Sequence, residues 1–304
     1  MRSISKVLAL IALLIIPANA RVTTTGSGKA GGSAGFSCAH SWCGPGDIQS
    51  GALMWVGLRA YSYATGGNKA VNVCLPAGGA CADMYTSATT GQLVITTISG
   101  TACNNTTPCT IATFYDQTGN TNCGGSACNL TQGTQSAQPQ LILNCLGTLP
   151  CAYSAGAANI GIATGITQAQ PFSYSVVMER TANFSSLTYA MTLNGGFAGF
   201  AGSANSIFMY NGGGVPTATA SDSSMHAMQL QWDAGAGYYA YIDGGSTSMS
   251  VGSAASLSSY IYLFSFNGSS NITGYMQEFG VWAGDFSGTT NGYMNTNQHS
   301  FWGF

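Results

Sequence analysis

Apolar and polar residues alternate with a period of two over much of the second half of the chain. Phe172–Glu179 and His226–Asp233 show this alternation, and Tyr238–Ile242, Tyr260–Phe266 and Tyr275–Trp282 follow as apolar segments of strand length. Glycine-rich turns separate the segments, and no long helical pattern lies between them. Short strands at this spacing predict an all-β fold, built as a two-sheet jelly-roll sandwich.

One or two short helices are expected beside these strands. Asp47 can cap a helix over about Gln49–Tyr61, and Thr289–Trp302 can form a terminal helix that packs three large side chains on the sandwich, Tyr293, Met294 and Trp302. A single domain over residues 38–304 is the simplest division, with disulfide-clipped loops in its first half. A boundary near Pro150 is the weaker alternative, because the first half alone has little apolar pattern to bury.

Residues 1–20 have the pattern of a secretory signal peptide. Arg2 and Lys6 precede the apolar run Val7–Ile16, and Ala18–Ala20 offers small residues where a signal peptidase cleaves. The run is shorter than the about 20 residues that a membrane-spanning helix needs, and no later segment approaches that length. Residues 21–37, rich in Gly, Ser and Thr, are expected to form a flexible leader. We therefore expect a secreted protein, extracellular or periplasmic, with no transmembrane segment after signal cleavage.

Ten cysteines lie in the first half of the chain, and none lies in the last 153 residues. An even number behind a signal peptide indicates disulfides in an oxidising compartment. Zinc is the alternative, but the spacings lack the two-residue gap of common ligand pairs, and only His40 lies nearby. We expect no metal site and no cofactor. Pairing of neighbours is favoured, although the sequence does not fix the connectivity; the pairs would be Cys38–Cys43, Cys74–Cys81, Cys103–Cys109, Cys123–Cys128 and Cys145–Cys151.

Charged residues make up only 5% of the chain, which narrows the classes of partner. Without Arg2 and Lys6, five basic residues stand against nine acidic ones, a formal charge of −4. No basic patch can neutralise a row of phosphates, so nucleic acid is not an expected partner. A surface of hydroxyl and amide groups suits sugar hydroxyls, and it is equally consistent with a merely neutral surface.

The segment Cys109–Gln132 carries the most specific motif of the chain. An alternating strand runs into Tyr115-Asp-Gln-Thr-Gly119, and Asn129-Leu-Thr-Gln132 follows after a short loop. This order resembles the catalytic domain of the secreted enzyme α-L-arabinofuranosidase B, of glycoside hydrolase family 54. In that family a similar strand runs into Tyr-Asp-Gln-Ser/Thr-Gly and then into an Asn/His-Leu-Thr-Gln segment.

The resemblance extends in both directions from this motif. Gly46–Ile48 followed by Gly57–Ser62 is similar to the opening of the family's domain, and Cys103–Cys109 is similar to a cysteine loop before its Tyr-Asp-Gln strand. Cys43 stands before the Gly-Pro pair rather than after it, so the first disulfide loop differs. The resemblance covers Asp47–Gln140, about a third of the chain, and is weaker in the second half.

This resemblance implies a fold and a substrate class. Members of the family have a concanavalin A-like jelly roll, and Trp232–Gly245 and Gly274–Trp282 are similar to the last strands of concanavalin-like and laminin-G-like jelly rolls. The implied partner is a polysaccharide that carries arabinofuranosyl groups. If the chain is an enzyme, the resemblance implies a retaining α-L-arabinofuranosidase.

The carboxylates that such chemistry needs are absent from the matching positions. A retaining glycosidase uses two carboxyl groups about 5 Å apart, one as nucleophile and one as acid. At the family's nucleophile position this chain has Asn205 or Ser206, and at its general-acid position it has Asn267. The family's adjacent cysteine pair has no counterpart, because no cysteine follows Cys151. The catalytic residues are therefore unassigned.

Two functions of different classes remain. As a non-catalytic lectin-like adhesin or structural surface protein, the chain would bind glycan through Asn205, Tyr210 and Asn267, which would converge on one cleft of a jelly roll. As a hydrolase, it would need another carboxylate pair, with Asp222 or Glu179 as a member. The alternative for the cleft residues is that Tyr210 lies in the core and both asparagines lie in turns. Neither the glycan nor the oligomeric state follows from the sequence.

Most of the other carboxylates have an expected structural role. Asp47 would cap a helix, and Asp116 would order the loop after it by accepting hydrogen bonds from backbone N–H groups. Asp233 and Asp243 stand where hairpin strands reach glycine-containing turns, and Glu278 lies inside a strand. By the same reasoning, the strand patterns around Trp232 and Trp282 place both indoles in the core.

Overall fold

The computed structural model describes residues 37–162, 165–182, 188–194, 196–200, 206–210, 217–219, 224–233, 237–249, 258–265 and 271–304. Phe36–Phe304 is one compact unit. None of the helices in the described part of the chain has the length and hydropathy of a membrane span. The elements are, in chain order, α1 (Pro45–Ile48), β1 (Ala52–Gly57), η1 (Tyr63–Thr65), β2 (Lys69–Cys74), β3 (Cys81–Tyr85), β4 (Cys109–Phe114), β5 (Leu130–Thr131), η2 (Gln135–Ala137), β6 (Gln140–Leu146), β7 (Leu149–Ala155), β8 (Ile160–Ile162), β9 (Phe172–Arg180), β10 (Thr188–Asn194), β11 (Gly196–Phe200), β12 (Ser206–Tyr210), β13 (Thr217–Thr219), β14 (His226–Asp233), β15 (Gly237–Ile242), β16 (Gly245–Met249), β17 (Ser258–Leu263), β18 (Thr273–Ala283) and α2 (Gly288–Trp302).

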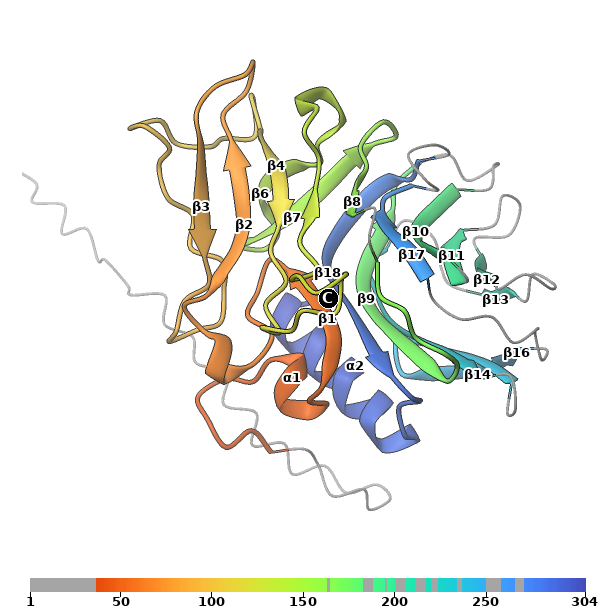
Figure 1. Ribbon diagram of the computed structural model, residues 1–304. Coiled ribbons are helices and arrows are strands. Elements are labelled where there is room, and N and C mark those ends of the chain that lie inside the picture. Colours follow the sequence, from red (N-terminus) through yellow and green to blue (C-terminus); the bar gives the residue numbers. More distant parts are fainter. Residues whose placement is uncertain are drawn as a thin grey trace, which may run out of the picture. The chain divides into compact units, whose positions relative to one another are not determined.

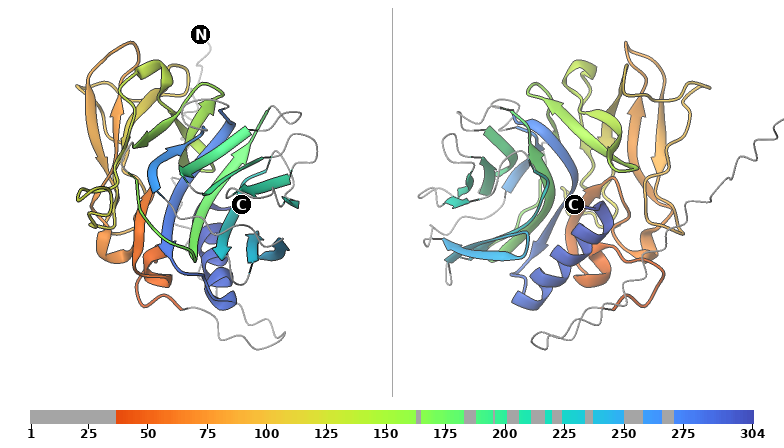
Figure 2. Two further views of the ribbon diagram at one scale, coloured as in Figure 1. Left: turned by 45° about the vertical axis from the view of Figure 1, so that its right-hand side comes forward. Right: turned by 180° about the vertical axis from the view of Figure 1, so that it is seen from behind.

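The strand β18 organises the fold. One of its edges pairs with β9, and the other pairs with β1 near its C-terminal end and with β7 near its N-terminal end. From β9 the ladder continues through β14 and β15 to β16. All pairings between the named strands are antiparallel, and the views in Figures 1 and 2 show β9 and β14 curving beside β18. The predicted all-β jelly-roll class is confirmed.

Two further groups of strands complete the fold. In one, β17 pairs with β10, and β11, β12 and β13 follow; β17 also pairs with β8, which pairs with β5. In the other, β6 pairs with β7 and with β4, and β4 pairs with β2, which pairs with β3. Figure 1 shows these two groups on opposite sides of β18 and β9. The chain passes Pro150 inside β7, which pairs with β6 before it and with β18 after it.

The alternating strands are buried on both of their faces. In β9, Phe172, Tyr174 and Val176 face the apolar core, while Ser173 and Ser175 alternate with them and are equally buried. The helix α2 covers the polar face, because Gln298 Nε2 donates a hydrogen bond to Ser175 Oγ at 2.9 Å. Alternation ordinarily indicates a strand with one face in water. Here the polar face is a buried layer between sheet and helix.

The terminal helix is confirmed with its end signals. Ser287 Oγ accepts a hydrogen bond from the backbone N–H of Thr290 at 3.1 Å, which caps the N-terminus. Gly303 ends the helix in the left-handed conformation, with φ of 78°. Met294 and Trp302 are buried as expected, and Tyr293 is half-buried.

The helix predicted over Gln49–Tyr61 is wrong. The helix α1 lies earlier, at Pro45–Ile48, and Ala52–Gly57 is the strand β1. All six residues of β1 except Leu53 are buried, and they pair with β18. A short run that is apolar on both faces carries no period of two, so its pattern does not separate a buried strand from a helix.

The two halves of the chain are held in different ways. The disulfide-clipped half, residues 38–155, contains all five disulfides, and each cysteine pairs with its neighbour in sequence as favoured. The cysteine-free half, residues 172–304, contributes most of the largest fully buried side chains of the described residues. Trp232 and Trp282 are among them, at 0% and 1% exposed, which confirms their place in the core.

Candidate functional site

The three residues predicted to bind glycan fall outside what the structure describes. Asn205 and Asn267 are not among the described residues, and neither is Asp222. Tyr210 ends the strand β12, but its side chain lies outside the described part. The predicted cleft therefore stays a prediction.

Several carboxylates are held by structural contacts. Asp116 accepts hydrogen bonds from the backbone N–H groups of Trp55, Thr118 and Cys128, at 3.0–3.2 Å, so it orders the loop after β4 as expected. Asp47 accepts from the backbone N–H groups of Gly44 and Tyr63, both at 2.8 Å. These carboxylates have their lone pairs directed at the protein.

Glu278 lies in a buried ion pair beneath α2. Its two oxygens accept from the guanidinium of Arg59, with Nη2 to Oε1 at 2.8 Å, and the side chains of both residues are at most 1% exposed. Gln298 Nε2 donates to Oε1 at 2.8 Å, and Trp302 Nε1 donates to Oε2 at 2.9 Å. A carboxylate with this set of partners, away from solvent, has a structural role.

Asp243 follows β15 directly, at the open end of the β14–β15 hairpin, and contacts two histidines there. One oxygen lies 2.6 Å from Nδ1 of the buried His226, and the other lies 3.2 Å from Nε2 of His299 on α2. Partial burial acts to raise the pKa of Asp243, but the hydrogen bonds from His226 and from the Ala227 N–H outweigh it, so the pKa is lowered overall. Through these two contacts Asp243 fixes the C-terminal turn of α2 to the sheet.

Glu179 and Asp285 are the carboxyl groups with raised pKa values. Burial raises the pKa of Glu179, with the charge of His226 acting in the opposite direction. Burial also raises the pKa of Asp285, to about 6, with a further contribution from Asp233, to which it is hydrogen-bonded. Carboxyl groups in hydrogen-bond contact, as Asp285 and Asp233 are, lie closer together than the roughly 5 Å that a retaining glycosidase needs.

Of the eight described carboxylates, only Glu179 has no hydrogen-bond or ion-pair partner among the described residues.

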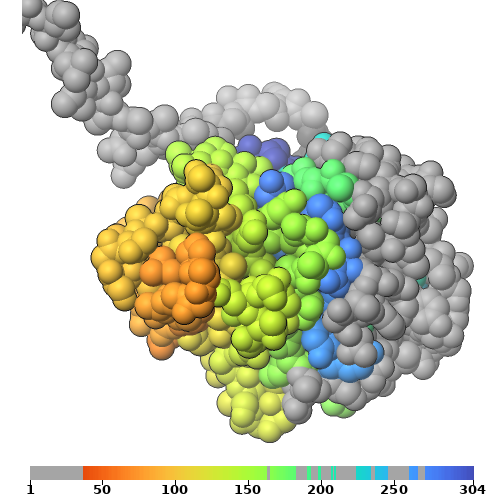
Figure 3. Space-filling model, turned by 90° about the horizontal axis from the view of Figure 1, so that it is seen from above, coloured from red at the N-terminus to blue at the C-terminus, as the bar shows by residue number. Residues whose placement is uncertain are grey.

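An open pocket of about 460 Å³ lies on the outer face of the disulfide-clipped half. Its residues come from the β2–β3 hairpin, from β4 and β5, and from the loop that includes η2; they are Cys74, Gly78, Gly79, Cys81, Ala112, Thr113, Thr131, Gln132, Gly133, Gln135 and Gln138. Figure 3 shows the hairpin tip and the η2 loop, orange and yellow-green, side by side on the surface. We call this the amide pocket.

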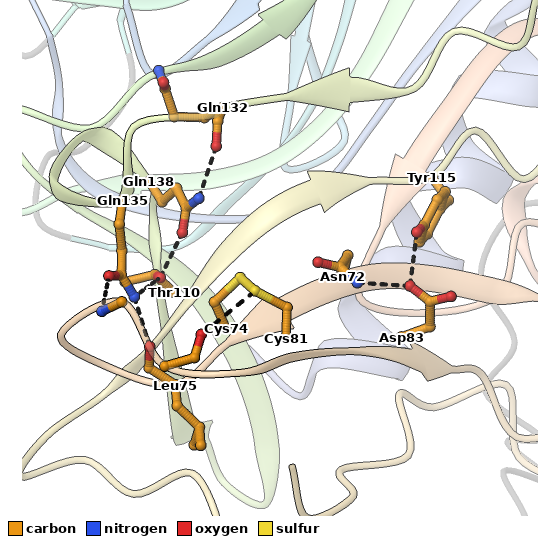
Figure 4. Close-up of a disulfide and its surroundings, with 12 residues drawn as sticks. Asn72, Cys74, Leu75, Cys81, Asp83, Thr110, Tyr115, Gln132, Gln135 and Gln138 are labelled. Atoms are coloured by element: carbon orange, nitrogen blue, oxygen red, sulfur yellow. Dashed lines mark hydrogen bonds between the residues drawn. A yellow bond between two sulfur atoms is a disulfide. The ribbon is translucent and has the colours of Figure 1, made fainter. Parts of the chain in front are cut away.

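Two glutamines, Gln135 and Gln138, brace the amide pocket (Figure 4). Gln135 accepts from the backbone N–H of Gly78 and donates to the carbonyl of Leu75 at 2.6 Å, so it fixes the hairpin tip. Gln138 accepts from Thr110 Oγ1 at 2.6 Å and donates to the carbonyl of Gln132 at 2.7 Å. The amides are thus committed to the protein, and they position the wall of the pocket.

Two threonine hydroxyls are left for a ligand. Thr113 of β4 and Thr131 of β5 are directly opposite each other in the ladder. Neither hydroxyl has a hydrogen-bond partner among the described residues. The Cys74–Cys81 disulfide forms a neighbouring apolar part of the wall.

A charged corner lies beyond the disulfide in Figure 4. Asp83 accepts from Asn72 Nδ2 at 2.8 Å and from the Tyr115 hydroxyl at 2.7 Å, and it pairs with Lys69 at 2.6 Å. The hydrogen bond from Lys69 lowers the pKa of Asp83 to about 2, while burial and the Asp83 carboxylate raise the pKa of Tyr115 to about 12. Near neutral pH the corner neither takes up nor releases a proton.

The pattern of the sequence did not single out the amide pocket. Its signal in the sequence is the spacing of Gln132, Gln135 and Gln138, three amides at intervals of three that begin with the last residue of the Asn-Leu-Thr-Gln motif. That spacing has no helical or strand period of its own, and the partners of the amides lie as far as 60 residues away.

Comparison with known proteins places the fold. No protein-family model matches the chain, and no curated protein matches its sequence. Among solved structures, the chain is similar to a GH54 α-L-arabinofuranosidase mutant soaked with 4-nitrophenyl α-L-arabinofuranoside (TM-score 0.62, 14% identity) and to a GH54 α-L-arabinofuranosidase soaked with a cyclic sulfate inhibitor (0.60, 15%). It is also similar to an arabinofuranosidase complexed with arabinofuranosyl-α-1,2-xylobiose (0.57, 15%).

Each of these matches covers 84% of this chain and 64% of the other, so the chain spans less than two thirds of their length. At 14–15% identity the likeness establishes the fold. The fold implied by the sequence resemblance is confirmed.

Proposed function

We propose that this chain is a secreted carbohydrate-active protein that recognises arabinofuranosyl-containing polysaccharide. The observation that carries the proposal is the GH54-like fold, shared over 84% of the chain with proteins whose structures hold arabinofuranosides. Because a fold hosts many functions, the support must also come from this chain's own chemistry. A chain with 5% charged residues and an open, uncharged pocket that holds the hydroxyls of Thr113 and Thr131 suits a neutral glycan.

Binding without hydrolysis is the function that the residues favour. Asparagines stand where the family resemblance places the nucleophile and the acid, at Asn205 and Asn267. Among the described carboxylates, Glu278, Asp243 and Asp116 are committed to structural contacts. In the proposal, Asn205, Tyr210 and Asn267 contact the sugar by hydrogen bonds and ring stacking.

Hydrolysis is the second candidate, and one observation favours it. Glu179 is half-buried, has no hydrogen-bond partner among the described residues and has a raised pKa. A carboxyl group with a raised pKa can serve as a general acid. It would need a second carboxylate about 5 Å away, and Asp222 is the one that the sequence leaves for that role.

The proposal is tested with oxidised protein that spans Arg21–Phe304. Retention in a native gel that contains arabinan, with no release of arabinose from 4-nitrophenyl α-L-arabinofuranoside, is the expected result. Release of arabinose that is lost in Glu179→Gln but kept in Asp47→Asn would establish the hydrolase instead. A folded protein that migrates freely through arabinan and arabinoxylan gels and releases no arabinose would refute both candidates.

Export is proposed on two grounds. Residues 1–20 have the pattern of a cleavable signal, and five disulfides with no free cysteine suit an oxidising compartment. Expression with a secreting host should give mature protein whose N-terminal residue is Arg21, which N-terminal sequencing detects.

A further inference from the structure

We infer that the amide pocket is a second glycan subsite, one that takes a short neutral oligosaccharide. The inference rests on the proposed function for the class of sugar, and it assigns binding to Thr113 and Thr131, for which the family resemblance implies no binding role. The pocket strands β2 and β4 lie on one side of β18 in Figure 1, and β12, which carries Tyr210, lies on the other. Tyr210, the one predicted cleft residue that stands on a described strand, therefore lies in a different group of strands from the pocket.

The lining selects an uncharged ligand. None of the residues that line the amide pocket carries a charge. In the charged corner next to the pocket, Lys69 Nζ lies 2.6 Å from Asp83 Oδ2, so the two charges neutralise each other. An acidic or basic ligand would therefore lose part of its hydration without gaining a counter-charge, whereas desolvating a neutral sugar hydroxyl costs less and can be offset by hydrogen bonds to neutral groups. The volume of about 460 Å³ lies within the range of small-molecule sites, about 300–1,000 Å³.

The polar groups of the pocket are arranged in advance of binding. Gln135 and Gln138 hold the hairpin tip and the loop before β6 through four hydrogen bonds. The Cys74–Cys81 disulfide closes the same hairpin covalently. Because the hairpin and the loop are already fixed, the protein loses little conformational entropy when a ligand binds, so preorganisation favours binding.

A row of polar side chains gives the ligand a direction. Asp83, Asn72, Thr113 and Thr131 are successive register partners across β3, β2, β4 and β5, so they lie side by side across the sheet. Thr113 and Thr131 line the pocket, and Asn72 and Asp83 continue the row beyond it by two strand spacings, about 10 Å, so a bound sugar can extend along the row as an oligosaccharide. The two unpartnered hydroxyls, on Thr113 and Thr131, stand at the pocket end of this row and can both donate and accept.

Gly133 allows the site to be blocked without disturbing the fold. A Cβ atom at Gly133 would meet nothing within 4 Å, and the residue is exposed at the pocket. Gly133→Leu therefore adds an apolar side chain at the pocket, with its Cβ in open space. Gly292→Leu is the matched control, because Gly292 is also exposed and open but lies in α2.

The experiment is calorimetry of the mature protein with three probes: linear arabinotriose, xylotriose and trigalacturonic acid. We expect arabinotriose to bind and trigalacturonic acid not to bind. Gly133→Leu should weaken arabinotriose binding by about tenfold or more, and Thr113→Val with Thr131→Val by roughly tenfold. Gly292→Leu and Thr121→Val, an exposed threonine with no side-chain partner among the described residues, should bind as the unmodified protein does.

The outcomes separate this inference from the proposed function. Arabinotriose binding that is unchanged in Gly133→Leu overturns the subsite and leaves the proposed function standing. Binding of xylotriose alone, lost in Gly133→Leu, supports the subsite and contradicts the arabinofuranosyl specificity. Tight binding of trigalacturonic acid at the pocket overturns the neutral-ligand argument, and no binding of any probe overturns the subsite.

Discussion

The disulfide-clipped half and the cysteine-free half of this protein are stabilised by different interactions. In residues 38–155, five disulfides close short loops, and the outer face carries exposed polar groups such as those of the amide pocket. In residues 172–304, α2 covers a buried polar layer, and Trp232, Trp282 and Trp302 are at most 1% exposed. The clipped half also contributes buried apolar side chains, such as Trp55 and Phe114, so the disulfides add to burial there.

The buried layer under α2 is cooperative, because its members share partners. Gln298 accepts from Gln229 at 2.6 Å and donates to Ser175 and to Glu278. Glu278 in turn binds Arg59, which comes from the other half of the chain. A local disulfide loop has no such long-range dependence. The two halves should therefore respond differently to substitutions, to reducing agents and to pH.

The largest effect is expected where a charge would be left without its partner. Glu278→Gln leaves the Arg59 guanidinium buried and unpaired, which should lower the free energy of unfolding by about 3–5 kcal/mol. Glu179→Gln, in the neighbouring strand but without a partner among the described residues, should change it by less than about 1 kcal/mol. Urea denaturation measures both. Equal losses in the two variants would contradict the cooperative layer.

The next effect tests the clipped half. Replacing Cys74 and Cys81 together by serine should lower the unfolding free energy by roughly 3 kcal/mol or less, since the loop is short. It should also weaken arabinotriose binding, because the disulfide is part of the pocket wall. The matched control is Cys145→Ser with Cys151→Ser, which removes a disulfide outside the pocket. Loss of binding in the control alone would break the comparison.

A smaller effect depends on pH and belongs to the cysteine-free half. The folded pKa of Asp285 is raised to about 6, so the associated stability is fully present below the unfolded value of about 3.9 and is lost as pH rises through about 6. Asp285→Asn removes this loss. Its Tm should exceed that of the unmodified protein above pH 6 and approach it at pH 4. A Tm difference that does not vary with pH would contradict the raised pKa that burial and the neighbouring Asp233 give Asp285.

The smallest effect has the opposite sign and belongs to the clipped half. The folded pKa of Asp83 is lowered to about 2, so its stabilising contribution is present above the unfolded value of about 3.9 and is lost as pH falls toward 2. Asp83→Asn should lower the Tm slightly at pH 6 and leave it unchanged at pH 2. Because Lys69 and Asp83 are both accessible to solvent, salt should reduce the difference at pH 6; a salt-independent difference would contradict the ion-pair explanation.

Local patterns were sufficient to predict much of the fold. The strands β9, β14, β15 and β18 were predicted from their patterns, and α2 was expected over Thr289–Trp302 as a helix that packs its large side chains on the sheet. Neighbour pairing of the cysteines was favoured because turn-forming residues lie between them, and the structure confirms it. All of these signals are local in sequence.

The errors and omissions come from contacts that are distant in sequence. Ala52–Gly57 was wrongly predicted as part of a helix. The strand β18 that buries it lies more than 200 residues later, so no local pattern indicates the pairing. The amide pocket was missed for a related reason: Gln135 is recognisable as a brace only when its contacts with Leu75 and Gly78 are known. Asn205 and Asn267 came from the family resemblance, and they lie outside the described residues.

The central claim, recognition of arabinofuranosyl polysaccharide, is tested most directly by native gel electrophoresis of the mature, oxidised protein. The gels would contain arabinan, galactan or no polysaccharide at equal concentration. The account predicts retardation in the arabinan gel, with mobility in galactan equal to that in the plain gel. Equal mobility in all three gels, from a protein shown to be folded by its cooperative unfolding, would contradict it.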